Sequence, residues 1–181
     1  FRTGGVFRLR DVVLLASHLQ KKRGEFDVHT YCLTDIVNEK TEIENVTLLP
    51  MQNEWKGWWA KMNLFSPDLA YLRPLLYMDL DTAVLKPLSS FLLQELPRSS
   101  VIMLRDFYNA GKAASGVMWI PAHNAKISLV WESWIANPAV HMRKYRGDQQ
   151  FIRSVIQPDC FWQDITQCIV SFKPGKKWRK E

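Results

Sequence analysis

The chain has 181 residues, of which 47% are hydrophobic and 23% are charged. This length suits one domain, and the apolar fraction excludes global disorder. No apolar run approaches the roughly 20 residues of a membrane-spanning helix, so we expect no span. Cys32, Cys160 and Cys168 have neither a CxxC nor a zinc-site spacing, which indicates reduced thiols in a cytoplasmic protein.

The net charge of +6 is concentrated at the C-terminus. Residues 171–181 contain five basic residues and one acidic residue, which together contribute +4. A nucleic-acid-binding protein more often carries positive charge across one face of its fold. We therefore expect a domain over residues 1–170, a solvated basic tail over 171–181 and no nucleic-acid partner.

Hydrophobic periodicity predicts helices and strands in alternation. The expected helices are 7–23, 57–65, 127–135 and 148–156. The expected strands are 28–33, 46–49, 75–78, 101–104, 117–120 and 165–172. Residues 75–78 are all apolar, which is typical of a strand buried on both faces in the centre of a parallel sheet. The alternation predicts an α/β domain with a mostly parallel central sheet flanked by helices.

Tryptophan is unusually frequent, and three of the eight tryptophans lie within residues 55–59. Clustered indoles suit either packing in an apolar core or stacking against the face of a sugar ring. Packing is the commoner cause, so it is the first expectation here.

Two aspartates, Asp79 and Asp81, directly follow the apolar run 75–78. Side chains two residues apart in an extended backbone point to the same side, so both carboxylates should face one crevice at the end of the strand. Adjacent carboxylates repel each other unless a cation neutralises them. Mn²⁺ or Mg²⁺ suits this arrangement, because it accepts one or two carboxylates and completes its shell with water and phosphate oxygens. The structural alternative is a pair of acids that cap a turn before Pro87.

Five further segments accompany the Asp79–Asp81 motif. They are Phe1 to Gly5, Cys32-Leu33-Thr34-Asp35, Trp58 to Pro67, Ser115-Gly116-Val117-Met118-Trp119 and Gly147 to Ile152. In this order they resemble the GT-A-fold DxD glycosyltransferases, in the group that contains glycogenin and the lipopolysaccharide galactosyltransferases. The resemblance implies a single Rossmann-like GT-A domain. It also implies transfer of a sugar from a nucleotide-diphosphate donor, with a UDP-sugar favoured, to a hydroxyl of a glycan, lipid or protein.

The charged residues receive roles from this resemblance. Asp81 would bind the metal directly, and Asp79 would share the metal or hold the ribose of the donor. Lys61 would contact the diphosphate or the donor sugar, although a surface lysine is the plain alternative. Asp106 would bind sugar hydroxyls, with a turn cap as its alternative.

The catalytic residues implied by the resemblance are Asp148, as a base or a group that orients the acceptor, and Gln149, beside the β-face of the sugar. An N-cap aspartate is the structural alternative for Asp148. The remaining donor-binding residues implied are Gly4, Gly5, Thr34, Asp35, Ser115 and Gly116.

The sequence departs from the family pattern at two places. Ala114 stands where relatives have Asn, and no histidine follows His141, whereas relatives end in a segment whose histidine completes the metal site. We assign none of the four histidines to a metal and expect a chain that is short at both ends for this fold. A truncated or degraded glycosyltransferase without turnover therefore stays open.

A haloacid-dehalogenase-like phosphatase is the other alternative, because its nucleophile strand also has an apolar run followed by DxD and Thr. Its later GDxxxD motif is incomplete here, since Ile152 stands where the second Asp belongs.

Overall fold

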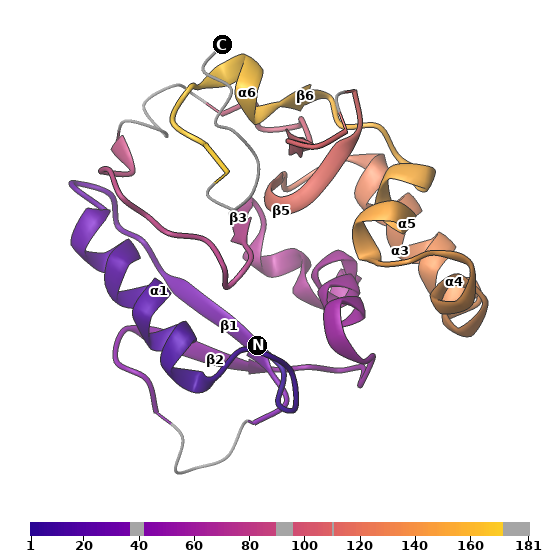
Figure 1. The fold of residues 1–181 in the computed structure, drawn as a ribbon, viewed down its shortest axis with the longest axis horizontal. Coiled ribbons are helices and arrows are strands. Elements are labelled where there is room, and N and C mark those ends of the chain that lie inside the picture. Colours follow the sequence, from indigo (N-terminus) through magenta and orange to yellow (C-terminus); the bar gives the residue numbers. More distant parts are fainter. Residues whose placement is uncertain (37–41, 90–95, 110, 172–181) are drawn as a thin grey trace.

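The computed structural model of this chain describes residues 1–36, 42–89, 96–109 and 111–171 (Figure 1). The helices and strands are α1 (Leu9–Lys22), β1 (Thr30–Thr34), β2 (Val46–Pro50), η1 (Gly57–Phe65), η2 (Pro67–Leu72), β3 (Leu75–Met78), β4 (Ile102–Arg105), β5 (Ala113–Ile120), α3 (Ala125–Ala136), α4 (Pro138–Lys144), α5 (Asp148–Val155), β6 (Cys160–Phe161) and α6 (Trp162–Ile165). Figure 1 shows α1, β1 and β2 on one side of the molecule and α3, α4 and α5 on the other. None of these helices has both the length and the apolar composition needed to cross a membrane.

The strands form two small sheets, so the prediction of one mostly parallel central sheet is wrong. β1 and β2 pair in parallel, and the other described strands form a sheet of order β3-β5-β4-β6. In this sheet β5 is antiparallel to both β3 and β4, and β4 is parallel to β6. β5 follows β4 after a short connection, which allows antiparallel but not parallel pairing. The mixed α/β class is confirmed.

β3 lies at the edge of the described four-stranded sheet and not at the centre of a parallel one, so this expectation is also wrong. Its residues are all half-buried. Leu75 and Tyr77 pack against one hydrophobic cluster, and Leu76 and Met78 pack against a second one. The run is apolar at every position because successive side chains meet different cores on the two faces of the sheet.

The helix predicted at 57–65 has the predicted bounds but forms a 3₁₀ helix, η1. Within η1 the side-chain Nδ2 of Asn63 donates to the carbonyl of Ala60 at 2.9 Å. That carbonyl would otherwise accept the next α-helical bond, and asparagine side chains compete for backbone groups in this way. The winding matters for the site, because 3₁₀ side chains three residues apart are aligned.

The strand predicted at 165–172 is not found in its described part, residues 165–171. Helix α6 ends at Ile165, and the hydroxyl of Thr166 accepts a bond from the Cys168 amide at 3.1 Å. Such a side-chain turn diverts the chain from an extended strand. The expected basic tail lies outside the described residues, apart from Ser171.

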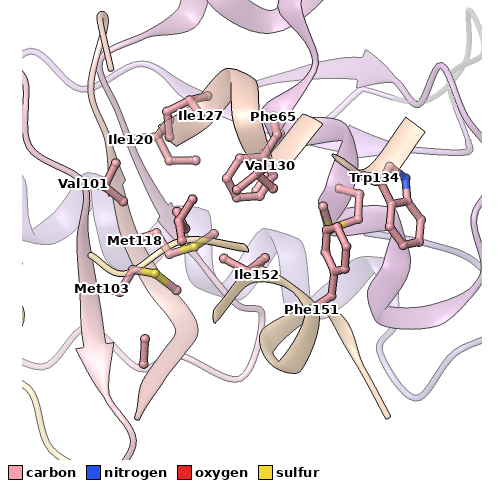
Figure 2. Close-up of a cluster of buried hydrophobic side chains, with 14 of the residues drawn as sticks. Phe65, Val101, Met103, Met118, Ile120, Ile127, Val130, Trp134, Phe151 and Ile152 are labelled. Atoms are coloured by element: carbon pink, nitrogen blue, oxygen red, sulfur yellow. The ribbon is translucent and has the colours of Figure 1, made fainter. Parts of the chain in front are cut away.

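The main hydrophobic core lies between the four-stranded sheet and helices η1, α3 and α5 (Figure 2). Trp134 is fully buried there, stacked on Trp59 at 5.0 Å between ring centroids and edge-on to Trp55 at 5.1 Å. Phe151 packs edge-on against the same indole at 5.3 Å. Core packing is therefore confirmed for Trp55 and Trp59. Trp58 differs, with 60% of its surface exposed.

Candidate active site

A buried lysine, Lys61, joins three separate segments of the chain. Its Nζ lies 2.9 Å from Asp79 Oδ1 and 2.9 Å from Asp148 Oδ2. The same ammonium donates to the hydroxyl of Ser115 at 3.1 Å and to its carbonyl at 3.3 Å. Ser115 in turn donates its hydroxyl hydrogen to Asp148 at 2.8 Å. We call Lys61, Tyr77, Asp79, Ser115 and Asp148 the Lys61 cluster.

The Lys61 cluster is largely shielded from solvent. The side chains of Lys61 and Asp148 are 7% and 9% exposed, whereas that of Asp79 is 34% exposed. Burial alone would lower the pKa of the Lys61 ammonium, but the charges of Asp148 and Asp79 outweigh burial and raise it. Lys61 therefore stays charged at neutral pH and neutralises part of the charge of two carboxylates.

An irregularity in β5 presents Ser115 to the lysine. Met103 pairs with Met118, but the next residue, Leu104, pairs with Ala114. The residues of β5 between these partners, 115–117, bulge out of register with β4, and bulges of this kind redirect side chains beside functional sites. The Asp79 amide closes the arrangement by donating to the Gly116 carbonyl at 2.8 Å.

Tyr77 belongs to the cluster but is missing from the predicted site. Its hydroxyl donates to Asp79 Oδ1 at 2.5 Å, and the Lys61 ammonium lies 5.1 Å from the centre of its ring. Tyr77, Asp79 and Asp81 are two residues apart in turn, so the period of an extended strand could have identified Tyr77. Burial, and then the nearby charge of Asp79, raise the pKa of Tyr77 well above its ordinary value.

We expect Tyr77 to resist ionisation in alkaline solution. Below a pH of about 10 the phenol is protonated in both folded and unfolded chains, so it adds no pH dependence there. Above that pH only the unfolded chain releases the proton readily, so stability falls as the pH rises. Absorbance at 295 nm should show one tyrosine that ionises only on unfolding. This late step should vanish in Tyr77→Phe, and its persistence would contradict the assignment.

A cavity of about 630 Å³ opens beside the Lys61 cluster. The predicted site residues that line it are Asp79, Asp81, Asp106, Gly116 and Gln149. Residues 82–88 and 167–171 form much of the remaining wall, which includes the exposed side chains of Leu85 and Val170. We call this space the acidic cavity. Asp79 and Asp81 thus line the same cavity.

Asp106 is 9% exposed and accepts bonds from both backbone and side chains. The Tyr108 and Asn109 amides donate to its Oδ1 at 2.8 and 3.1 Å, which confirms a turn-capping role. Its Oδ2 accepts from Gln149 Nε2 at 3.1 Å and lies 3.9 Å from the guanidinium of Arg153. Gln149 and Arg153 are four residues apart on α5 and face the same carboxylate. Arg153 was not predicted, although this spacing is its signal.

The acidic cavity has suitable donors for a divalent cation that arrives with a phosphate ligand. Asp79 Oδ1 faces Lys61 and Tyr77. Asp79 Oδ2 lies beside Gly116, where a Cβ added to the glycine would be 3.4 Å from this oxygen. Asp81 is exposed at the same cavity. Nowhere in the described part of the chain do three or more His, Cys, Asp or Glu side chains form a metal-binding group. Two carboxylates match the way Mg²⁺ is held together with substrate phosphates.

The other predicted donor-binding residues form a second group. Asp35 accepts bonds from the Thr3 amide at 2.9 and 3.1 Å and from the Thr3 hydroxyl at 2.5 Å. Burial tends to raise the pKa of Asp35, but the bonds from Thr3 lower it below its ordinary value. Thr34 is buried beside Asp35, and Gly4 and Gly5 follow Thr3 in sequence. None of the residues of this group lines the acidic cavity in the described structure.

Comparisons of the chain with protein-family models, with curated proteins and with solved structures find no match.

Proposed function

We propose that this protein binds a nucleotide-diphosphate sugar together with Mn²⁺ or Mg²⁺ and transfers the sugar to a hydroxyl group. The observation that carries the proposal is that Asp79, Ser115 and Asp148 all contact the ammonium group of Lys61. These residues come from four of the six segments that resemble GT-A glycosyltransferases, and they are far apart in sequence. Their meeting beside an acidic cavity favours a shared site over four independent structural roles.

The donor diphosphate would occupy the acidic cavity next to Asp79 and Asp81. These carboxylates would hold the divalent ion, which as a Lewis acid would stabilise the charge that builds up on the leaving nucleoside diphosphate. Asp106 and Gln149 form the neighbouring wall and offer polar groups to the sugar hydroxyls. The bond from the anomeric carbon to the β-phosphate oxygen breaks, and a bond to the acceptor oxygen forms.

Asp148 would accept or orient the proton that the acceptor hydroxyl loses. Its Oδ2 is engaged by Lys61 and Ser115, so the proposal assigns this role to Oδ1. An ammonium has three hydrogens, and Asp79, Asp148 and Ser115 provide enough acceptors to engage all of them. Lys61 thus acts as a positioning residue that holds Asp79 and Asp148 on either side of its ammonium group, in place of the direct donor contact that the resemblance implies.

The proposal is tested by release of nucleoside diphosphate from a panel of UDP-sugars and GDP-sugars, with Mn²⁺, with Mg²⁺ and with EDTA. We expect release that requires a divalent ion and that falls at least about 100-fold in Asp148→Asn. Asp27→Asn is the matched control, because Asp27 is an exposed aspartate outside the acidic cavity.

Absence of release with every donor and both ions would contradict transfer. Turnover of p-nitrophenyl phosphate that is lost in Asp79→Asn would instead favour the phosphatase alternative.

A further inference from the structure

Trp58 has a surface that core packing does not explain. Of the tryptophans in the described part of the chain, it alone is exposed, at 60%, whereas its neighbour Trp59 is 7% exposed. Trp59 packs on Trp134 in the main core. Leaving a large indole in water forgoes the stabilisation that its burial would bring, so the position calls for a role other than stability.

The indole of Trp58 lies against the backbone that leads into the proposed reaction centre. A Cβ added at Gly147 would lie 3.2 Å from Trp58 Nε1 and 3.5 Å from its Cδ1. Gly147 is the N-cap of α5, and the next two residues are Asp148 and Gln149. The missing side chain at residue 147 therefore lets the ring approach the start of this helix closely.

The winding of η1 relates Trp58 to Lys61. Residues three apart are aligned along a 3₁₀ helix, so Trp58 and Lys61 lie on the same side of η1. Lys61 reaches inward to Asp79 and Asp148, and Trp58 lies one turn earlier with much of its surface in solvent. The exposed ring thus stands at the outer edge of the Lys61 cluster, on its Asp148 side.

The surroundings of Trp58 are polar. Lys56 lies two residues before it and Arg146 directly precedes Gly147, and both are exposed. No other exposed large hydrophobic residue lies on η1 or in residues 141–155, all of which are described. Protein-interface tryptophans usually sit within a ring of further contacts that exclude water. An isolated indole with polar neighbours instead suits a sugar ring, which has an apolar face and a rim of hydroxyls.

We propose that Trp58 is the binding platform for the acceptor and that the acceptor is a carbohydrate. A sugar ring stacked on the indole would lie beside Gly147, the residue that precedes Asp148 at the start of α5. This inference rests on the proposed function, because only a transferase has an acceptor. It narrows the possible acceptors from glycans, lipids and proteins to glycans.

Saturation-transfer difference NMR with the methyl glycosides of glucose, galactose, mannose and N-acetylglucosamine tests this platform without any donor. We expect signals from the ring protons of at least one glycoside with the wild-type protein. They should weaken at least about tenfold in Trp58→Ala and be partly retained in Trp58→Phe. Tyr71→Ala is the control, because Tyr71 is 70% exposed and lies outside the acidic cavity. Far-UV circular dichroism verifies that each variant is folded.

Absence of signals with all four glycosides, or signals unchanged in Trp58→Ala, would overturn the inference. Self-association that is lost in Trp58→Ala while the saccharide signals persist would assign the indole to a protein contact and would overturn it as well. Nucleotide-sugar turnover without a Trp58-dependent signal leaves the proposed function standing and removes the platform. A Trp58-dependent signal without nucleotide-sugar turnover removes the proposed function and leaves a saccharide-binding site.

Discussion

Replacement of Lys61 by methionine should lower the free energy of unfolding by about 3 kcal/mol. Methionine is one atom shorter than lysine but keeps a similar unbranched shape, and it removes the charge that lies 2.9 Å from both Asp79 and Asp148. Removing one partner from a buried ion pair typically costs about 3–5 kcal/mol, because the remaining charge is left uncompensated. The lower end applies here, since the Asp79 side chain is 34% exposed and solvent screens part of its charge. Urea denaturation at pH 7 measures the change.

Two further variants separate lost charge from lost packing. The double variant Lys61→Met, Asp148→Asn should be more stable than the sum of the single losses predicts, by about 1–3 kcal/mol. The reason is that it no longer has two carboxylates facing each other without the lysine between them. Lys56→Met is the matched control on an exposed lysine just before η1, and it should change stability by no more than about 0.5 kcal/mol. Equal losses for the Lys61 and Lys56 variants would contradict the role assigned to the cluster.

Replacement of Asp81 by asparagine should weaken Mn²⁺-dependent donor binding by about 100-fold or more while leaving the fold intact. Asp81 is exposed at the acidic cavity, so its replacement should have little effect on stability. The neutral amide retains an oxygen but loses the charge that a hard divalent cation requires. Isothermal titration calorimetry with a UDP-sugar and Mn²⁺ measures the affinity, and the melting temperature monitors the fold.

The control for this variant is Asp27→Asn, which changes the net charge equally at an exposed position outside the acidic cavity. It should bind the donor as the wild type does. An unchanged affinity in Asp81→Asn would remove Asp81 from the metal site. An equal loss in both variants would indicate long-range electrostatic attraction in place of direct coordination.

Local signals in the sequence identified most elements but not their arrangement. The expected helix at 57–65 has the observed bounds. The bounds of α1, α3 and α5 differ from those of the predicted helices by no more than two residues. Strand pairing was not recoverable in this way. The apolar run of β3 reads as a central parallel strand, yet it is apolar because two separate clusters receive its alternate side chains.

The candidate site was predictable where it follows motifs and not where it follows packing. Asp79, Asp81 and Asp106 line one cavity, as their positions after the ends of β3 and β4 suggest, and Gly116 and Gln149 line it with them. The engagement of Lys61 with Ser115 depends on the bulge at 115–117, for which Gly116 inside a strand is a local signal. That the bulge would turn Ser115 towards Lys61 is not indicated by any local pattern. Tyr77 and Arg153 were missed because their relevance depends on periodicity relative to a partner, Asp79 or Gln149, whose role has to be known first.

If the acidic cavity holds a nucleotide-diphosphate sugar together with a divalent ion, calorimetric titration of the wild-type protein with UDP-sugars and GDP-sugars, in Mn²⁺ and then in EDTA, should detect the complex. We expect saturable binding of at least one donor in Mn²⁺ and its loss in EDTA. Absence of heat with every donor in Mn²⁺ and in Mg²⁺, from protein that is folded by circular dichroism, would contradict the account.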